Sequence, residues 1–302
     1  MYSDFISLAD FTSEELVDLL DVAGELKRKL KSREDHRVLA GQMLVMIFEK
    51  PSLRTRVTFE TGIFQLGGSS IFIEDRLGRR ETVPDVARNL ERWVNGIVAR
   101  THRHEDVIEL AHHASVPVIN ALTDSQHPCQ VLADAMTLRE HRGTLDGLRV
   151  AFVGDGNNMF ASWAELATRF SFHLTLVCPE GYEGDPAVRT RAEKEARAGF
   201  TVSNDPMAGV KNADVVYTDV WASMGQEDEQ EKRAAIFAPF QVNARMMAQA
   251  KADALFMHCL PAHRGEEVTD DVIEASRSIV FDQAENRLHA QKAVLVRLMA
   301  PR

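Results

Sequence analysis

QMLVMIFEKPSLRTR, residues 42–56, is the stretch that sets the fold class of this chain. Its apolar run MLVMIF (43–48) predicts a strand that is buried on both faces, as the strands of parallel sheets are. Pro51 and Ser52 then end the strand and favour a turn into a helix. A buried strand that leads directly into a helix is half of a β-α-β unit. The stretch therefore predicts a parallel sheet flanked by helices.

The start of that helix has an unusual composition. It carries hydroxyl groups and arginines where acidic residues would suit the positive N–H groups of a helix start. Backbone N–H groups, Ser52, Arg54 and Thr55 can converge on a small, doubly charged anion such as phosphate. The alternative is that Ser52 caps the helix and the arginines lie in solvent. This stretch alone leaves both interpretations open.

The alternation of strand and helix continues along all 302 residues, without an internal repeat or a low-complexity tract. Strands are expected at 43–48, 69–74, 95–100, 116–120, 149–154, 173–178, 214–220 and 255–261. Helices are expected at 12–31, 55–66, 83–93, 104–114, 129–141, 162–170 and 185–198. Residues 278–299 are expected to form a strand followed by a long helix. The pattern breaks at HRGTLDG (141–147), which predicts a boundary between two domains there.

Composition and charge exclude several classes of protein. Hydrophobic residues make up 45% and charged residues 26% of the chain, which is typical of a soluble globular protein. No apolar run approaches the roughly 20 residues of a membrane helix. The N-terminal stretch has no basic region followed by an apolar core, so we expect a cytoplasmic protein without a secretory signal. The net charge of −10 argues against nucleic acid or an anionic membrane as partner.

The cysteines exclude two further kinds of site. Cys129, Cys178 and Cys259 are an odd number and contain no CxxC pair, so neither a disulfide framework nor a structural zinc site is expected. In an acidic protein, an anion site requires positive charge to be concentrated locally. Residues 54–56 are one such place.

Polar or reactive residues follow six of the predicted strands. The segments are SLRTR, ARTHRH, LTDSQHPCQ, GDGNN, DVWASMG and HCLPAHRG. In open α/β sheets, ligands bind outside the carboxyl ends of the strands. The six segments therefore predict one site to which both halves of the chain contribute.

GDGNN (154–158) resembles half of a dinucleotide-binding fingerprint, but the third glycine is missing. A lone GxG is weak evidence for nicotinamide binding. The amides of Asn157 and Asn158 can instead bind the carboxylate or the amine of a zwitterion.

The other segments also have structural alternatives. His127 and Gln130 surround a helix start at Pro128 and can donate to a carbonyl group and an amide, or form an exposed capping turn. Arg100 has the same ambiguity. Cys259 can be an inert buried residue, and the charge run QEDEQEKR (226–233) reads as a solvated helix face.

SLRTR, HPCQ, DGNN, DVWASMG and HCLP, in this order and at these intervals, resemble the ornithine carbamoyltransferases over essentially the whole chain. DxWxSMG distinguishes the ornithine enzymes of that family from their relatives, and HCLP is shared with several transcarbamoylases. The resemblance implies an α/β protein with two domains, each a parallel sheet flanked by helices, which is the transcarbamoylase fold. It assigns 1–142 to carbamoyl phosphate, 143–280 to ornithine, and 281–302 to a helix that packs back on the first domain.

The resemblance also implies the functional residues. Those that bind carbamoyl phosphate are Ser52, Leu53, Arg54, Thr55, Arg76, Arg100, His127, Gln130, Cys259, Leu260 and Arg287. Those that bind ornithine are Asn158, Asp219, Ser223 and Met224. Arg54, Arg100, His127, Asp219 and Cys259 are expected to be catalytic, with neither a metal nor an organic cofactor. The partners implied are the two small substrates and further copies of the chain, in a homotrimer whose subunits share active sites.

The chain departs from the family pattern at three positions. Leu53 replaces the threonine of the usual S-T-R-T-R motif, so any role there belongs to its main chain. Arg76 stands where relatives commonly have Gln or His, and Pro84 lies in a segment that normally lacks proline. Because of these departures, the affinity for phosphate and the choice of amine stay open.

The implied reaction is transfer of the carbamoyl group from carbamoyl phosphate to the δ-amine of ornithine, which gives citrulline and phosphate. The alternatives are a carbamoyltransferase for putrescine or an N-acylated ornithine, a nicotinamide-dependent oxidoreductase, and a catalytically silent paralogue. Loss of Arg54, His127 or Cys259 would mark a silent paralogue, and all three are present.

Overall fold

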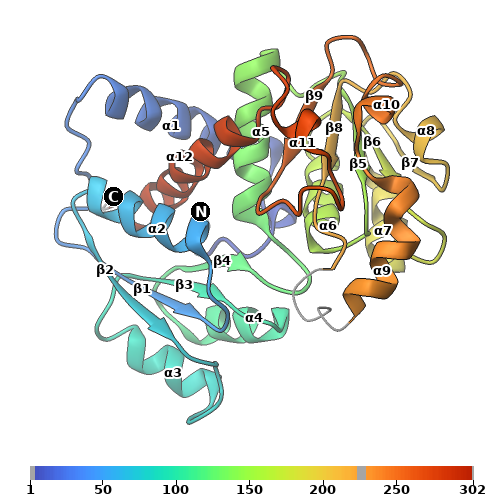
Figure 1. Ribbon diagram of the computed structural model, residues 1–302. Coiled ribbons are helices and arrows are strands. Elements are labelled where there is room, and N and C mark those ends of the chain that lie inside the picture. The colour runs from blue at the N-terminus through green and yellow to red at the C-terminus, as the bar shows by residue number, and fades with distance from the viewer. Residues whose placement is uncertain (1–3, 223–228, 301–302) are drawn as a thin grey trace. The chain divides into compact units, whose positions relative to one another are not determined.

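A computed structural model describes residues 4–222 and 229–300 of the chain (Figure 1). The chain divides into two compact units, Met1–Met136 with Glu285–Arg302, and Thr137–Ala284. Each unit contains one parallel sheet with helices packed around it, as the sequence predicts. Among the described residues, no helix has the length and apolar character needed to span a membrane.

The first unit is built on a four-stranded parallel sheet in the order β2-β1-β3-β4. Its strands are β1 (Met43–Phe48), β2 (Ser69–Glu74), β3 (Gly96–Arg100) and β4 (Val118–Leu122). Its helices are η1 (Leu8–Asp10), α1 (Ser13–Lys31), α2 (Leu53–Gln65), α3 (Val83–Leu90) and α4 (His104–His113). Leu44 of β1 pairs with Ser70 on one side and Gly96 on the other, so β1 is central, whereas the edge strand β2 is largely exposed.

Two long helices run from one unit into the other. They are α5 (Pro128–Arg142) and α12 (Val280–Met299). Within the first unit, α12 lies beside α1 and α2 (Figure 1), where Lys27 donates to Asn286 and Lys292 donates to Gln65.

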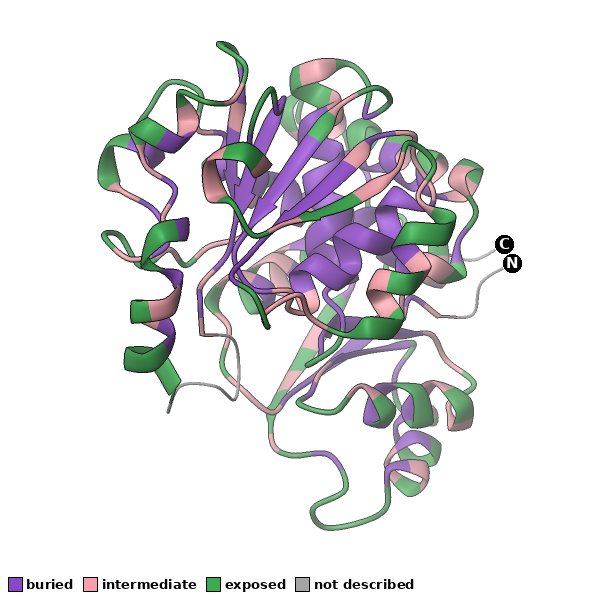
Figure 2. Ribbon diagram, turned by 90° about the vertical axis from the view of Figure 1, so that its right-hand side faces the viewer, coloured by how far each residue is buried: buried purple, intermediate pink, exposed green. Residues whose placement is uncertain are grey.

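The second unit is built on a five-stranded parallel sheet in the order β7-β6-β5-β8-β9. Its strands are β5 (Arg149–Val153), β6 (His173–Val177), β7 (Phe200–Ser203), β8 (Val215–Thr218) and β9 (Leu255–His258). Its helices are α6 (Asn158–Ala167), α7 (Pro186–Glu195), α8 (Pro206–Gly209), α9 (Gln230–Phe237), η3 (Ala238–Phe240), α10 (Ala244–Met247) and α11 (Asp270–Ile273). Figure 2 shows this sheet and the helix faces against it buried, with the outer helix faces exposed.

The strand expected at the start of 278–299 is wrong. Ser278 forms a single isolated bridge with Phe256, and the backbone is helical from Val280 onward. A short apolar run cannot be assigned to strand or helix by periodicity alone. Asp282 in the first turn favours the helix, because its charge complements the positive end of the helix dipole.

Candidate active site

The helix start that follows β1 has the properties of an anion site. Ser52 is the N-cap residue of α2 and is extended (φ −151°, ψ 109°), and within this described segment its hydroxyl makes no capping hydrogen bond. Thr55 is buried, whereas the side chain of Leu53 is 74% exposed. Leu53 therefore offers this site only its backbone. No acidic side chain lies in the first turn of this fully described helix, so none competes with an incoming anion.

Arg287 of α12 joins two other predicted residues. Its guanidinium donates to Gln130 Oε1 at 2.5 Å and to Thr55 Oγ1 at 2.8 Å, and its side chain is buried. Gln130 in turn donates through Nε2 to Asp134 at 2.8 Å. Residues from α2, α5 and α12 are thereby held in one cluster.

Arg100 and His127 belong to the same cluster. Burial, together with the positive charges of Arg287 and Arg54, lowers the pKa of Arg100 to about 10. Burial and the charges of Arg287 and Arg100 hold the pKa of His127 well below its usual range, so its imidazole is neutral at pH 7. The buried Nε of Arg100 has no hydrogen-bond partner in the part of the chain that the structure describes. Arg100 is repelled by Arg54 and by Arg287, and a bound dianion would relieve that repulsion.

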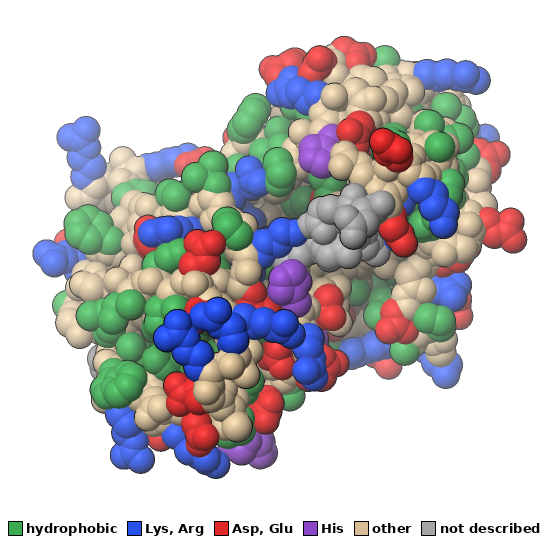
Figure 3. Space-filling view, turned by 60° about the horizontal axis from the view of Figure 1, so that its bottom comes forward, with side chains coloured by type: hydrophobic (Ala, Val, Ile, Leu, Met, Phe, Trp, Pro, Cys, Tyr) green, Lys and Arg blue, Asp and Glu red, His purple; other side chains and the backbone are tan. Residues whose placement is uncertain are grey.

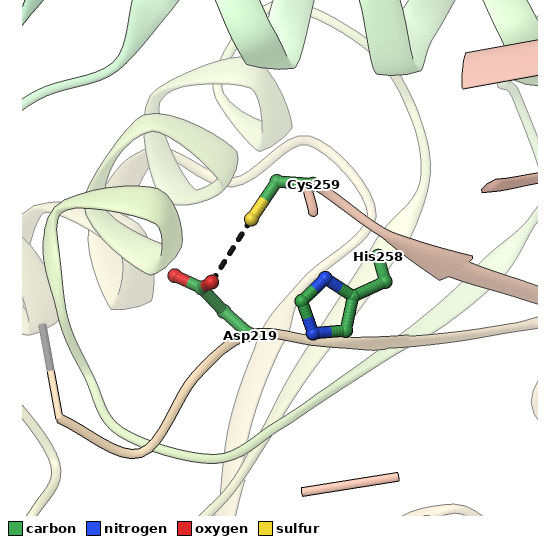
Figure 4. Close-up of side chains that lie close together, drawn as sticks. All are labelled: Asp219, His258 and Cys259. Carbon is green, nitrogen blue, oxygen red and sulfur yellow. Dashed lines mark hydrogen bonds between the residues drawn. The ribbon is translucent and has the colours of Figure 1, made fainter. Parts of the chain in front are cut away.

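Within the second unit, a thiol and a carboxylate lie in contact. The Sγ–H of Cys259, which follows β9, donates to Asp219 Oδ1 at 2.9 Å (Figure 4). Asp219 follows β8 and also accepts from Asn157 Nδ2 at 2.9 Å and from the Val220 N–H at 2.8 Å. The carboxylate is only 8% exposed, and these three donors fix its orientation.

His258 supports the Cys259 turn from within the core. Its Nδ1 accepts the Leu260 N–H at 2.8 Å, so Nε2 carries the proton and donates to buried Glu267 at 3.1 Å. Asp219, His258 and Cys259 offer three possible metal-ligand atoms within 4.8 Å of one another. Since both ring nitrogens of His258 already have partners, the imidazole is a structural support and not a free ligand. Leu260 adopts φ +58°, a conformation rare for a bulky residue, so this turn is held by its surroundings.

The remaining predicted residues are placed as follows. Asn158 is the first residue of α6, and its carbonyl accepts from Ser162 Oγ at 3.1 Å. Ser223 and Met224 lie outside the described residues.

Arg76 is exposed in the loop between β2 and α3, where Asp75 pairs with Arg79 and Arg80. Figure 3 shows Lys and Arg side chains gathered on this face of the first unit. Pro84 occupies the first turn of α3 behind the Thr82 cap, where proline fits a helix.

Two supporting residues differ from the sequence interpretation. Asn157, whose amide was expected to be able to bind a zwitterion, caps α6 by accepting the Met159 and Phe160 N–H groups while it orients Asp219. Asparagine directly before a helix is a recognisable capping signal. Arg233, read as part of a solvated helix face, is buried, which corrects that interpretation for this residue.

Arg233 holds together the segments around Asp219. It donates to Asp155 Oδ2 at 2.7 Å, to the Trp221 carbonyl at 3.0 Å and to Glu229 at 3.1 Å. Burial raises the pKa of Asp155, the Arg233 charge opposes that rise, and nearby Asp219 adds to it. A lone arginine within a charge run gives no sequence signal of such a role.

The geometry of the GDGNN turn disfavours a dinucleotide. The Gly156 N–H donates to the Tyr182 carbonyl at 2.9 Å, and a Cβ at Gly156 would lie 2.5 Å from the Glu183 and Gly184 backbone. Because Asn157 also caps the first turn of α6, the N–H groups that would hold a pyrophosphate already have partners.

Comparisons with known proteins agree with this geometry. Residues 3–140 match the carbamoyl-phosphate-binding domain of the aspartate/ornithine carbamoyltransferases, and residues 146–298 match their Asp/Orn-binding domain. The chain is 53% identical to an ornithine carbamoyltransferase of Thermococcus kodakarensis, over 98% of this chain and 96% of that protein. It is 51% identical to a Pyrococcus furiosus relative named as an anabolic ornithine carbamoyltransferase, over 98% and 96%.

Solved structures give the same result. The ornithine carbamoyltransferase of Pyrococcus furiosus superposes with a TM-score of 0.95 at 51% identity, over 98% of this chain and 96% of that one. The ornithine carbamoyltransferase of Thermus thermophilus superposes with a TM-score of 0.90 at 45% identity, over 99% of both chains. On its motifs, its two parallel sheets and these full-length similarities, the chain belongs to the aspartate/ornithine carbamoyltransferase family.

Proposed function

We propose that this protein transfers the carbamoyl group of carbamoyl phosphate to the δ-amine of L-ornithine, giving L-citrulline and phosphate. The observation that carries the proposal is the cluster in which Arg287 binds Gln130 and Thr55 beside Arg100 and a neutral, buried His127, with Arg54 close to Arg100. Relatives about 50% identical over the whole chain bear the name ornithine carbamoyltransferase, which supports this substrate pair.

The phosphoryl end of the substrate is bound at the start of α2. The hydroxyls of Ser52 and Thr55 and the backbone of Leu53 donate to its oxygens, and the guanidiniums of Arg54 and Arg287 neutralise its charge. Such charge-assisted hydrogen bonds are about twice as strong as neutral ones. Because the same donors fit free phosphate, they also stabilise the leaving group.

The carbamoyl end is activated by Arg100, His127 and Gln130. Arg100 and the neutral imidazole donate to the carbonyl oxygen, where negative charge develops as the amine attacks. Gln130 stands beside them, with its carbonyl oxygen fixed by Arg287. Donors aimed at a developing oxyanion typically supply the largest single contribution to acyl transfer.

The amine end of ornithine is prepared by Asp219, Cys259 and the Leu260 backbone. An alkyl ammonium is mostly protonated near pH 7 and must lose a proton before it attacks carbon. The Asp219 carboxylate lies next to the Cys259 thiol, where it can orient the amine and receive that proton. Asn158, Ser223 and Met224 hold the amino-acid end of the substrate, and the reaction needs no metal or organic cofactor.

A homotrimer with shared sites, located in the cytoplasm, completes the proposal. Large hydrophobic side chains are exposed on the first unit, as expected of a surface that another copy covers. They include Leu53, Val57, Phe64, Ile71, Ile73 and Trp93. Arg76, in an exposed loop of this unit, would reach the carbamoyl-phosphate site of a neighbouring subunit. The cytoplasmic location is supported by Cys259, because a working thiol persists in a reducing compartment.

The decisive experiment offers carbamoyl phosphate with a panel of amines and measures phosphate release and ureido product. L-ornithine should be the preferred acceptor, ahead of putrescine and N-acetylornithine. Preference for either of those amines would reassign the substrate. Phosphate release without any ureido product would refute carbamoyl transfer.

A further inference from the structure

Glu49 is the last residue before the turn that leads to the anion site, and it binds two other loops. Its Oε1 accepts the Leu77 N–H at 3.0 Å, and its Oε2 accepts the His102 N–H at 2.8 Å. Its own N–H donates to the Arg100 carbonyl at 2.9 Å. All these contacts lie within the first unit, at the carboxyl ends of β1 and β3.

Each of the three segments that meet at Glu49 leads to a residue of the proposed carbamoyl-phosphate site. The chain runs from Glu49 itself to Ser52 in three residues. Leu77 follows Arg76, and its side chain packs in the core of this unit, so the arginine loop is attached there by both backbone and side chain. His102 follows Arg100 by two residues. The Glu49 carboxylate therefore links its own segment to the backbone just after Arg76 and just after Arg100.

A negative charge is unexpected at this position. Glu49 stands three residues before a proposed phosphate cradle, and it forms no ion pair with any described residue. Burial raises the pKa of Asp106, Arg103 opposes that rise, and the charge of Glu49 adds to it. The negative charge of Glu49 therefore acts on at least one neighbouring ionisable group, Asp106. By electrostatics alone, Glu49 should weaken the binding of a dianion.

The geometry accounts for the choice of a carboxylate. Only a carboxylate presents two acceptor oxygens side by side, so it can receive one N–H from each of two loops. The amide of a glutamine has one acceptor and one donor, and its NH2 group would face a backbone N–H. A shorter aspartate would not reach both loops.

We propose that Glu49 is a positioning residue for carbamoyl phosphate. It fixes the Ser52–Thr55 turn and the segment after Arg100 for the site of its own chain, and the arginine loop at Leu77 for the site of the neighbouring subunit. This geometric role outweighs its electrostatic cost. The inference rests on the proposed function, because it assigns the three loops to one substrate.

The test compares Glu49→Gln with the unaltered protein by titration with inorganic phosphate and with carbamoyl phosphate. If Glu49 positions the loops, the variant should bind both anions about tenfold more weakly. Its KM for ornithine at saturating carbamoyl phosphate should stay within about twofold. If Glu49 acts only through its charge, removal of that charge should tighten binding, and equal or tighter binding would overturn the proposal.

Amide hydrogen exchange provides a readout that a general loss of stability would not reproduce. The Leu77 and His102 amides should exchange faster in Glu49→Gln. The Ser115 amide, which donates to Glu91 at 2.7 Å in the same unit, should be unchanged. Faster exchange at all three amides would mean that the unit is loosened as a whole, and would contradict a positioning role.

Two further variants complete the design. Glu91→Gln removes a carboxylate that accepts the Ser115 N–H and, among the described residues, forms no hydrogen bond with the three loops, so it should leave anion binding unaltered. Glu49→Asp keeps the charge, so weaker anion binding supports positioning and normal binding contradicts it, even if Glu49→Gln does not fold. Failure of the unaltered protein to make citrulline would refute the proposed function, while the phosphate titrations would still decide the role of Glu49.

Discussion

At the scale of single residues, hydrogen bonds and nearby charges set the orientation and the pKa of the side chains at the proposed site. Asp219 is oriented by Asn157, by the Val220 N–H and by Cys259, so its carboxylate has one fixed orientation at the proposed amine site. Arg54 lies close enough to Arg100 to depress its pKa, which places two cations beside one anion position. Three predictions belong to this scale.

Arg54→Ala should weaken the binding of carbamoyl phosphate by about 10- to 100-fold, because hydrogen bonds to charged groups contribute about 1.5–3 kcal/mol each. The fold should be unaffected, since Arg54 is at the first turn of α2. Titration with carbamoyl phosphate measures the effect. Arg56→Ala is the matched control, as Arg56 pairs with Glu60 and lies over Phe72 on the same helix. Near-normal affinity in Arg54→Ala would remove Arg54 from the site.

Asp219→Asn should raise the KM for ornithine by about tenfold or more and leave carbamoyl-phosphate affinity unchanged. The variant loses the charge that attracts the amine and one acceptor for the donors around it. Steady-state kinetics with each substrate varied in turn provide the measurement. Asp253→Asn, an exposed carboxylate of the same unit paired with Arg142, serves as control. An equal loss of both affinities would indicate a folding defect.

Cys259→Ser should be about tenfold slower but clearly active, and Cys259→Ala slower still. A serine hydroxyl can replace the thiol as donor to Asp219, whereas alanine cannot. Ornithine already supplies the nucleophile, so a covalent enzyme intermediate is unnecessary. Rapid-quench sampling with mass analysis checks this. Detection of a carbamoylated Cys259 that forms and decays at the rate of turnover would establish covalent catalysis instead.

At the scale of elements, the C-terminal half of α12 is bound to the first unit through polar side chains. Lys292 is fully buried, and its ammonium donates to Gln65 at 3.0 Å and lies 3.4 Å from Nε2 of His36. Nδ1 of His36 contacts the Glu34 carbonyl, so Nε2 is left as an acceptor. Neither contact of Lys292 is with a carboxylate, and burial lowers its pKa to about 8. Helix α12 thus carries an ionisable group in the interface that holds Arg287 beside Thr55.

Lys292 should make stability rise with pH between about 8 and 10. The pKa of this lysine is lower in the folded than in the unfolded protein, so folding carries a penalty below pH 8 that disappears as the unfolded lysine also loses its proton. The shift corresponds to about 3 kcal/mol. Between pH 7 and pH 9.5, denaturant unfolding should show that the unaltered protein gains about 2 kcal/mol of stability relative to Lys292→Met. Parallel pH profiles for the two proteins would contradict it.

The neighbouring His289 does not titrate in this window. Burial and the charges of Lys292 and Lys27 lower the pKa of His289 to about 3, so this histidine is neutral throughout the window. All other ionisable groups are present in both proteins. The difference between the pH profiles of the unaltered protein and Lys292→Met therefore isolates the contribution of Lys292 to the free energy of unfolding.

At the scale of the whole molecule, the proposed trimer predicts a recovery of activity that requires two subunits. If Arg76 acts on the site of a neighbour, chains carrying Arg76→Ala and chains carrying Arg54→Ala should complement each other. Each parent should be nearly inactive alone. Unfolded together and reassembled, they should recover activity, because some interfaces combine an intact Arg54 with an intact Arg76.

Native mass spectrometry of the reassembled sample verifies that mixed trimers form. Mixed trimers without recovered activity would mean that Arg76 acts within its own chain or has no role in catalysis. A monomer in sedimentation experiments would refute the trimer itself. Salt dependence gives an independent readout, because an arginine beside a dianion should lose influence as ionic strength rises.

Sequence periodicity predicted the helices and strands far better than it predicted the side-chain contacts between residues distant in the chain. The strand expected at 43–48 is β1, and the helix expected at 12–31 is α1, which Thr12 caps, because both signals are local. Arg287 and Thr55 stand 232 positions apart, so only the resemblance to a family could bring them together before the structure did. Arg233 and Glu49 gave no signal, since their roles arise from segments that meet only in the folded chain.

The passage of α12 from one unit into the other has a consequence for how the protein is made. The first unit consists of an early and a late stretch of the chain, separated by the whole second unit. During translation, the early stretch leaves the ribosome before α12 is synthesised. The surface that packs against α12 therefore stays exposed to solvent until the residues after 285 are translated. Thr55 and Gln130 receive their guanidinium partner only then. In a nascent chain, the contacts of Arg287 with Thr55 and Gln130 at the proposed anion site therefore form only after the second unit has been synthesised.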